Sequence, residues 1–328
     1  MKSILLLSFS LIIVSFTLTW VIMKFSLRRN ILDIPNERSS HTQPTPRGGG
    51  LAIVISWYVG ITILFLTESI NRNLYFALLC GILLAIISLI DDLYDIKPSI
   101  RLIAQTSAAI ISLIFLNGIQ PVLLFGINIF PNIILVVITI TGMVWFINLY
   151  NFLDGIDGYA SIEAIMMSFA LFLVSGENIG LLLIASTVGF LIWNWPKARI
   201  FMGDVGSTQL GFILVVLGIY LHNEHRLSII YWLILAAPFW FDATLTLFRR
   251  WRNNEKLSIA HRKHMYQRLV QSGFSHLKVD ILLTLLNTIL ILLVLISVRY
   301  KMLQIPFLVL TVFMMFLISV YTDKRKQF

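Results

Sequence analysis

Charge is scarce in this sequence. Asp, Glu, Lys and Arg make up 12% of its 328 residues, while apolar residues make up 58%. A soluble globular domain carries about 25% charged residues. This shortage of charge excludes an ordinary water-soluble domain, and it indicates that most of the chain has lipid as its solvent.

Cysteine is scarcer still, and the N-terminus lacks the features of a cleaved signal. Cys80 is the only cysteine, which excludes a disulfide framework. The apolar run that ends near Met23 is too long for a secretory signal peptide, and it has no small-residue cleavage site. We therefore expect this run to be retained as a membrane span.

What the sequence has instead is a series of long apolar runs. A membrane-spanning helix needs roughly 20 such residues, and eleven segments qualify. We predict an all-α fold, a polytopic membrane helix bundle of about 11 transmembrane helices that forms one domain over residues 1–328. The expected spans cover residues 3–23, 50–67, 74–90, 102–118, 131–147, 159–175, 179–194, 208–222, 228–247, 279–298 and 304–321.

The distribution of positive charge predicts the orientation of the bundle. One set of loops holds 20 of the 25 Lys and Arg residues, and the opposite set holds five. Because basic loops stay in the cytoplasm, we place the N-terminus outside and the C-terminus inside. Most acids lie in the same loops, so we expect the active site on the cytoplasmic face of the inner membrane. The net charge of +9 is then a topology signal and does not indicate nucleic acid.

The first long cytoplasmic loop contains Ser-Ser-His-Thr (39–42) and then Pro-Thr-Pro-Arg-Gly-Gly-Gly (44–50). The prolines hold the chain extended, and the glycines allow backbone to approach a ligand closely. Arg47 beside a helix start is a candidate anion site. The alternative is a stiff linker whose arginine anchors the helix at the lipid headgroups.

The third expected span ends in Asp91-Asp92-Leu-Tyr-Asp95. In a helix Asp91 and Asp95 share a face, where like charges repel each other. A divalent cation or a cationic partner would relieve this repulsion. The alternative is a surface cluster paired with Lys97 and Arg101.

The most polar stretch of the chain is Asn-Leu-Tyr-Asn-Phe-Leu-Asp-Gly-Ile-Asp-Gly (148–158), which lies between two apolar runs. Its amides and carboxylates are Asn148, Asn151, Asp154 and Asp157. Such side chains are costly at a membrane unless they line a polar cavity or bind a ligand. Hard oxygen donors of this kind suit Mg²⁺, although a structural polar turn is the plainer reading.

Three further segments place polar residues near the same face. Phe-Met-Gly-Asp-Val-Gly-Ser (201–207) supplies Asp204, and its glycine-rich backbone suits phosphate. Asp242 lies inside the ninth span, where a carboxylate is either a site or a paired structural group. In the last large loop, a helix would put His261, His264 and Arg268 on one face, which favours anion binding over a metal site. Binding of lipid headgroups is the alternative.

With these pieces in chain order, the sequence resembles the polyprenyl-phosphate N-acetylhexosamine-1-phosphate transferases. The four motifs that carry the resemblance begin at residues 44, 91, 148 and 201, and the resemblance covers nearly the whole chain. The last loop reads His-Arg-Lys-His rather than consecutive histidines, which looks like the O-antigen-initiating branch rather than the pentapeptide transferases.

The resemblance implies an enzyme that moves N-acetylhexosamine-1-phosphate from a UDP-sugar to undecaprenyl phosphate in the membrane lipid, releases UMP, and initiates a cell-surface polysaccharide. It also implies a Mg²⁺ cofactor, with Mn²⁺ as a substitute, and it leaves a homodimer open. By position, Asp204 would bind the metal, Asp91 and Asp92 would serve the lipid phosphate and the metal region, and Arg47 would bind substrate. Asn148, Asn151, Asp154 and Asp157 would line the nucleotide and metal site, and His261, Arg262, His264 and Arg268 would hold the diphosphate.

Two other functions remain open from the sequence. An aspartate-rich, Mg²⁺-dependent membrane prenyltransferase would use Asp91 and Asp92 in a similar way, but it needs a second such motif. A cation- or proton-coupled transporter would place its acids near the bilayer midplane, in internal repeats. Here the acids lie at one expected membrane surface, and no repeat is visible.

Overall fold

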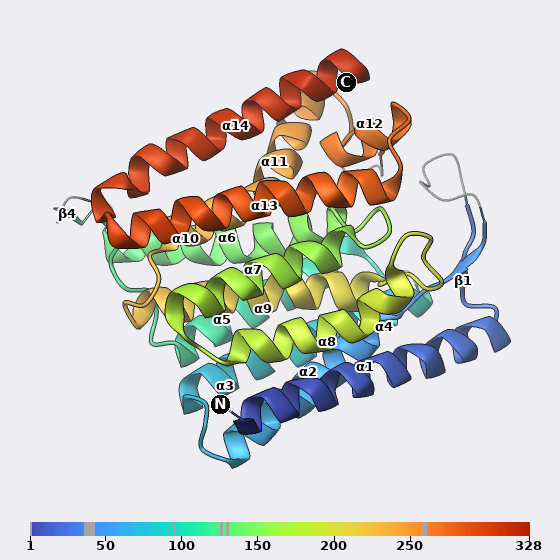
Figure 1. The fold of residues 1–328 in the computed structure, drawn as a ribbon, viewed down its shortest axis with the longest axis horizontal. Helices are drawn as coiled ribbons and strands as arrows, with labels where there is room; N and C mark the ends of the chain where they lie inside the picture. The colour runs from blue at the N-terminus through green and yellow to red at the C-terminus, as the bar shows by residue number, and fades with distance from the viewer. Residues whose placement is uncertain (1, 36–42, 95, 125–126, 129–130, 258–260) are drawn as a thin grey trace.

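The computed structural model describes residues 2–35, 43–94, 96–124, 127–128 and 131–257, and then 261–328 (Figure 1). The Ser-Ser-His-Thr segment (39–42) and Asp95, both named above, lie outside the described residues.

The described chain is all-α apart from two short hairpins, in which β1 pairs with β2 and β3 pairs with β4. Long apolar segments form helices because a helix satisfies every backbone donor and acceptor without water. The elements are α1 (Lys2–Arg28), β1 (Leu32–Asp33), β2 (Thr45–Pro46), α2 (Gly50–Leu66), α3 (Arg72–Leu79), α4 (Gly81–Tyr94), α5 (Pro98–Phe115), β3 (Leu123–Leu124), β4 (Ile127–Asn128), α6 (Asn132–Phe152), α7 (Tyr159–Ser175), α8 (Ile179–Asn194), α9 (Asp204–Asn223), α10 (Ile229–Leu235), α11 (Ala237–Arg252), α12 (Met265–Gln271), α13 (His276–Arg299), a 3₁₀ turn (Lys301–Leu303) and α14 (Gln304–Arg325).

A helix or a broken helix stands at each of the expected spans. In the described residues seven helices are long and apolar enough to cross a membrane, and the bent pair α10–α11 makes an eighth. The helices α2, α7 and α8 are apolar but shorter. The polytopic helix bundle is therefore confirmed, while the count of 11 spans and the orientation of the termini stay predictions.

Two expected spans are broken, and side chains bond the backbone at both breaks. The third span divides at Cys80 into α3 and α4, where Gln209 donates to the carbonyl of Gly81 and the Tyr58 hydroxyl donates to that of Leu78, at 3.0 Å. The ninth span bends by 73° between α10 and α11, where the Trp240 indole donates to the carbonyl of Leu233 at 2.8 Å. Pro238 lies in the first turn of α11, where a missing N–H costs little. Buried side chains can replace backbone bonds in this way inside a membrane protein.

Helix α9 forms the centre of the bundle. Every residue from Val205 to Leu221 is buried, and α2, α4, α6, α7 and α10 all pack against the helix. In contrast, α1 and α14 lie on the outside and expose most of their apolar residues (Figure 1). The sequence Gly-Asp that opens α9 is thereby placed at one end of the molecular core.

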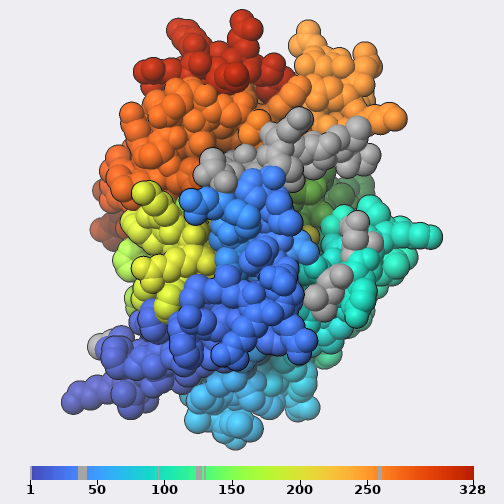
Figure 2. Space-filling model, turned by 90° about the vertical axis from the view of Figure 1, so that its right-hand side faces the viewer, coloured from blue at the N-terminus to red at the C-terminus, as the bar shows by residue number. Residues whose placement is uncertain are grey.

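The loops that carry the motifs gather at one end of the bundle, on the right in Figure 1, where β1 and α12 lie. Figure 2 looks onto this end and shows segments from the N-terminal, middle and C-terminal parts of the chain in contact with one another. The N- and C-termini lie at opposite ends of the helices (Figure 1). The bundle thus brings residues far apart in sequence to one surface.

Candidate active site

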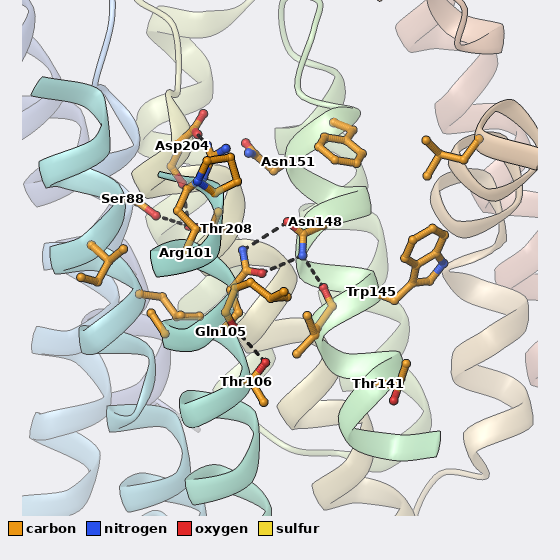
Figure 3. A pocket seen from close by; sticks show the side chains of 18 of the residues that line it. Ser88, Arg101, Gln105, Thr106, Thr141, Trp145, Asn148, Asn151, Asp204 and Thr208 are labelled. Carbon is orange, nitrogen blue, oxygen red and sulfur yellow. Dashed lines mark hydrogen bonds and ion pairs between the residues drawn. The ribbon is translucent and has the colours of Figure 1, made fainter. Parts of the chain in front are cut away.

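A cavity of about 840 Å³ lies between α4, α5, α6, α9 and α11 and includes residues of the loop before α12. Figure 3 shows Asp204, Arg101 and Asn151 near one another, with Thr106 and Thr141 farther along α5 and α6. The apolar lining includes Leu84, Ile87, Leu102, Ile140, Val144 and Leu247. The polar lining comprises Ser88, Arg101, Gln105, Thr106, Thr141, Asn148, Asn151, Asp204, Thr208, His261 and His264.

Asp204 opens the central helix and faces this cavity. Gly203 precedes it with φ of +76°, a conformation that glycine adopts without strain. The Asp204 carboxylate lies 3.7 Å from the Arg101 guanidinium, and Asn151 lies beside it (Figure 3). The turn before α9 therefore places the Asp204 carboxylate at the end of the buried helix, where it faces the cavity.

The two aspartates at the end of α4 have different surroundings. Asp91 accepts from Arg101 at 2.7 Å and from the backbone N–H of Ile96 at 2.9 Å. Asp92 is partly buried, and its Oδ2 atom has no hydrogen-bond partner among the described residues. Asp91 is thus engaged in an ion pair, while Asp92 keeps an oxygen available for a ligand.

Arg47 lies next to Asp92. Its Nη2 atom donates to the backbone carbonyl of Asp92 at 2.6 Å, and its positive charge acts on both Asp92 and Asp204. The glycine loop after Arg47 therefore belongs to the same site as the aspartates, as the sequence predicted.

Backbone pairing between two motifs creates this proximity. Gly49 and Gly50 donate to the carbonyls of Phe201 and Met202 at 2.9 and 2.8 Å, and Phe201 donates to that of Pro46 at 2.8 Å. At Gly50 an added Cβ would lie 2.4 Å from the Cα of Gly206. The glycines of both motifs are needed because the two backbones touch.

We expect Gly206→Ala to lower the free energy of unfolding by about 1–3 kcal/mol, the usual range for overpacking. The new Cβ would lie 2.7 Å from the Cα of Gly50 and 2.4 Å from the Met202 side chain. Thermal unfolding in detergent measures the loss. Gly142→Ala is the matched control, since its Cβ would meet nothing within 4 Å and alanine favours a helix. Equal stability of the two variants would contradict the close packing.

The two asparagines of α6 are held by partners that the sequence did not indicate. Asn148 and Gln105 exchange amide hydrogen bonds of 2.7 and 3.3 Å, and Asn148 also donates to the carbonyl of Val144. Asn151 accepts from the Ser207 hydroxyl at 2.7 Å. Both amides line the cavity, with their orientation set by α5 and α9.

The Asp-Gly-Ile-Asp-Gly turn places its two aspartates in different environments. Asp157 is paired with His276 at 3.1 Å and accepts from the N–H of Ala198 at 3.1 Å. Asp154 has no such ion pair in the described chain. Its burial, with the nearby charges of Asp204, Asp157 and Asp92, raises the pKa of Asp154 to about 7.

The loop before α12 corrects the expected helical face of histidines and arginines. Helix α12 begins only at Met265, so His261 and His264 lie in extended chain, with ring centroids 4.8 Å apart. Both line the cavity. Burial, followed by the charge of His264, lowers the pKa of His261 to about 3, so this imidazole is neutral rather than cationic.

The two arginines of this loop do not line the cavity. Arg268 is 2% exposed and donates to Asp323 at 2.6 Å and to the carbonyl of Lys326. The carbonyl of Arg262 accepts from Gln271 at 2.7 Å. Arg268 therefore ties α12 to the C-terminal segment, and its expected place beside the histidines is wrong.

Sequence reasoning missed Arg101 and Gln105 as site residues. Arg101 was considered as a surface ion-pair partner of the Asp91-Asp92 cluster, and it does pair with Asp91, but it also lies 3.7 Å from Asp204. A signal was present, because Arg101 and Gln105 are one helical turn apart on α5 and so lie on the same face. An arginine and a glutamine on one side of an apolar helix indicate a polar neighbour.

The carboxylates at this site fit a magnesium ion. Among the described residues no three His, Cys, Asp or Glu side chains lie close enough to hold a metal by themselves. Mg²⁺ does not need such a cage, because one or two carboxylates, water and substrate phosphates usually complete its shell. The unpaired Asp92 oxygen and the cavity-facing Asp204 provide donors of this type.

The chain is similar in sequence to known transferases. A probable undecaprenyl-phosphate N-acetylglucosaminyl 1-phosphate transferase of Bacillus subtilis is 29% identical over 280 residues, which cover 79% of this chain and 75% of that protein. An undecaprenyl-phosphate alpha-N-acetylglucosaminyl 1-phosphate transferase of Thermotoga maritima is 34% identical over 203 residues (62% and 61%). A phospho-N-acetylmuramoyl-pentapeptide-transferase of Streptococcus pneumoniae is 29% identical over 226 residues (62% and 67%).

The sequence profile of one family covers the part of the chain that builds most of the site. It matches residues 74–222, from α3 to the end of α9, and so includes Asp92, Asp154 and Asp204. The resemblance that the motifs indicated is therefore confirmed: these residues of a multi-pass membrane protein match the profile of glycosyl transferase family 4.

Proposed function

We propose that this protein transfers N-acetylhexosamine-1-phosphate from a UDP-N-acetylhexosamine to undecaprenyl phosphate, releases UMP, and so initiates a cell-surface polysaccharide such as O-antigen. The observation that carries the proposal is a cavity in which the Asp204 carboxylate and two histidines share the lining with many apolar side chains. A phosphate on a long hydrocarbon chain needs both kinds of surface. The names of the relatives describe enzymes that act on polyprenyl phosphates.

The flank of the bundle offers a route for a lipid substrate. Leu102 and Trp145 line the cavity and are also 53% and 42% exposed on the outside of the molecule. Side chains of this kind face hydrocarbon when the helices lie in a bilayer. An acceptor lipid could therefore enter sideways between α5 and α6 and bring its phosphate toward Asp204.

The reaction is a phosphoryl transfer. An oxygen of the acceptor phosphate forms a bond to the sugar-bearing phosphorus of the donor, the bond between that phosphorus and the bridging oxygen breaks, and UMP leaves with the electron pair. A phosphate monoester has a second pKa near 6 and is mostly ionised at neutral pH. Direct attack then needs no protein base, which favours it over a covalent aspartyl intermediate.

The protein would position the substrates and neutralise their charge. Arg101 and Arg47 lie beside the aspartates and would offset the negative charge of two phosphorylated substrates. His261 and His264, on the other wall, would donate to the donor diphosphate. Bound Mg²⁺, held by Asp204 and Asp92 with Asp154 nearby, would supply further stabilisation of the developing charge.

The proposed transfer is tested by UMP release from the purified full-length protein in detergent. We expect UMP when the protein receives undecaprenyl phosphate and one of a panel of UDP-sugars, which includes UDP-N-acetylglucosamine, UDP-N-acetylgalactosamine and UDP-N-acetylmuramoyl-pentapeptide. Undecaprenol, which lacks the phosphate, is the matched control and should yield none. Absence of UMP with every donor, or equal release without the lipid, would contradict the proposal.

A further inference from the structure

A carboxylate inside α11 stands outside the cavity but is bonded to the loop that lines it. Asp242 is 1% exposed. Its Oδ1 atom accepts from the backbone N–H of Met265 at 2.9 Å and from the Thr246 hydroxyl at 3.1 Å, and its Oδ2 atom accepts from the N–H of Tyr266 at 3.5 Å. An intramembrane aspartate is costly unless such partners are present. Here the partners belong to the start of α12.

The same carboxylate lies next to an imidazole of the cavity. His264 is 2% exposed, and its Nδ1 atom is 3.5 Å from the Asp242 Oδ1 atom. The Nδ1 atom has no hydrogen-bond partner among the described residues, so the charge of the carboxylate faces it directly, and the Nε2 edge is the one that remains for a ligand. A carboxylate in this position sets the ring orientation of a histidine. The His261 ring, 4.8 Å away, packs against the ring that Asp242 holds.

Helix α11 holds the other end of this loop as well. Arg250, two turns after Asp242, is 2% exposed and donates to the Glu255 carboxylate at 3.1 Å and to the carbonyl of Lys256 at 2.6 Å. The segment that includes His261 and His264 is therefore attached to α11 both before and after the histidines. Leu247, between the two anchors, lines the cavity itself. One helix thus provides a wall of the cavity and the frame of the histidine loop.

We propose that Asp242 is a positioning residue for the transfer reaction, which holds His264, and through it His261, in the orientation that binds the diphosphate of the donor. This inference rests on the proposed function. Asp242 touches no substrate, since it acts through the imidazole. The proposal thus gives a role to Asp242, a carboxylate of the ninth span that none of the four motifs contains.

The first test is Asp242→Asn, which keeps the size of the side chain and an oxygen that can accept from Met265 and Thr246. It removes the negative charge that faces the Nδ1 atom of His264. We expect kcat for UMP release to fall about 10–100-fold, the range found when a residue that orients a histidine is changed, while KM for undecaprenyl phosphate stays within about twofold. Asp242→Glu, which restores the carboxylate, should recover part of the loss.

The second measurement separates positioning from a loss of folding. In a His264→Gln background, Asp242→Asn should cause less than about a threefold further loss, because the group through which it acts is already gone. A radiolabelled donor keeps the residual turnover measurable. Ser228→Ala is the matched control: it removes a side-chain cap at the start of α10, far from the histidine loop, and should leave kcat within about twofold.

The outcomes distinguish this proposal from the function on which it rests. If the wild-type protein releases no UMP, the proposed transfer itself is wrong. If the wild-type protein is active and Asp242→Asn matches it, or if the losses of the two variants multiply in the double variant, Asp242 does not act through His264. A folded, weakly active Asp242→Asn protein with non-additive losses supports the positioning role.

Discussion

Asp204→Asn is expected to lower the rate of UMP release about 10³-fold or more while the protein stays folded. Asp204 is the acid that the central helix presents to the cavity, and asparagine retains its shape but not its charge. Loss of a metal ligand removes several kcal/mol of transition-state stabilisation, and each 1.36 kcal/mol is tenfold in rate. Single-turnover measurements with saturating lipid and donor would report the loss in the chemical step.

A second acid–arginine pair at the other end of the bundle provides the control for this experiment. Glu177 is paired with Arg226, much as Asp204 lies near Arg101, and both acids are partly exposed. Glu177→Gln removes a surface ion pair, whose net contribution is small, and should keep UMP release within about twofold. Near-normal turnover by Asp204→Asn would refute the role of Asp204, because the control excludes a general effect of neutralising a paired acid.

The same experiment reads out folding independently of activity. The charges of other acids act on Asp204 or are acted on by it, so removing its charge relieves repulsion, which offsets the loss of the contact with Arg101. We therefore expect Asp204→Asn to elute as the wild type does and to melt no earlier. An inactive but aggregated variant would not separate chemistry from folding, whereas an inactive and folded one would.

Most of the fold could be predicted from hydropathy, because an apolar segment that lies in lipid must form a helix to satisfy its backbone hydrogen bonds. The helix from Tyr159 to Ser175 agrees with the expected range residue for residue. The breaks near Cys80 and Ala236 could not be predicted in the same way. They depend on partners from elsewhere in the fold, such as Gln209 at the first break, and a window of hydropathy contains no information on those partners.

The candidate site, like the fold, could be predicted from the sequence only in part. The glycine and aspartate motifs predicted that their segments would lie on one face, but their glycines were assigned to the approach of a ligand, whereas in the structure Gly50 packs against Gly206. The motifs did not predict which acids would be available to a ligand. Asp157 is engaged by His276, which is 119 residues away in sequence, and Asp91 is engaged by Arg101. Competition between an internal ion pair and a ligand is decided by tertiary distance, not by spacing along the chain.

The histidine loop illustrates the limit of periodicity arguments. Spacings of three and four residues put His261, His264 and Arg268 on one face only if the segment is helical. Asp242 instead accepts the first N–H groups of α12 and so begins that helix at Met265. An acid more than twenty residues away thus determines where the helix starts, and the position of Arg268 changes with it.

Removal of Mg²⁺ is the second large effect we expect. Excess EDTA should reduce UMP release to background, and added Mg²⁺ or Mn²⁺ should restore it, because two phosphorylated substrates cannot lie beside Asp204 and its neighbouring acids without a cation to offset their charge. The charges of Asp92 and Asp204 act on each other, and both act on Asp154. Full turnover in EDTA, verified by metal analysis of the purified protein, would exclude the metal as an essential component.

The affinity for Mg²⁺ should also depend on pH, and the protonation of Asp154 determines whether it rises or falls as the pH increases. Burial and the charges of Asp204, Asp157 and Asp92 raise the pKa of Asp154 to about 7 in the metal-free protein. Below that pH the cation must displace a proton, so its apparent dissociation constant should rise about tenfold per pH unit, and above it the constant should level off. Calorimetry without substrate measures this directly, since the lipid phosphate titrates near pH 6. In Asp154→Asn the pH dependence just below pH 7 should vanish along with part of the affinity; the same slope in that window in the variant would assign the proton to a different acid.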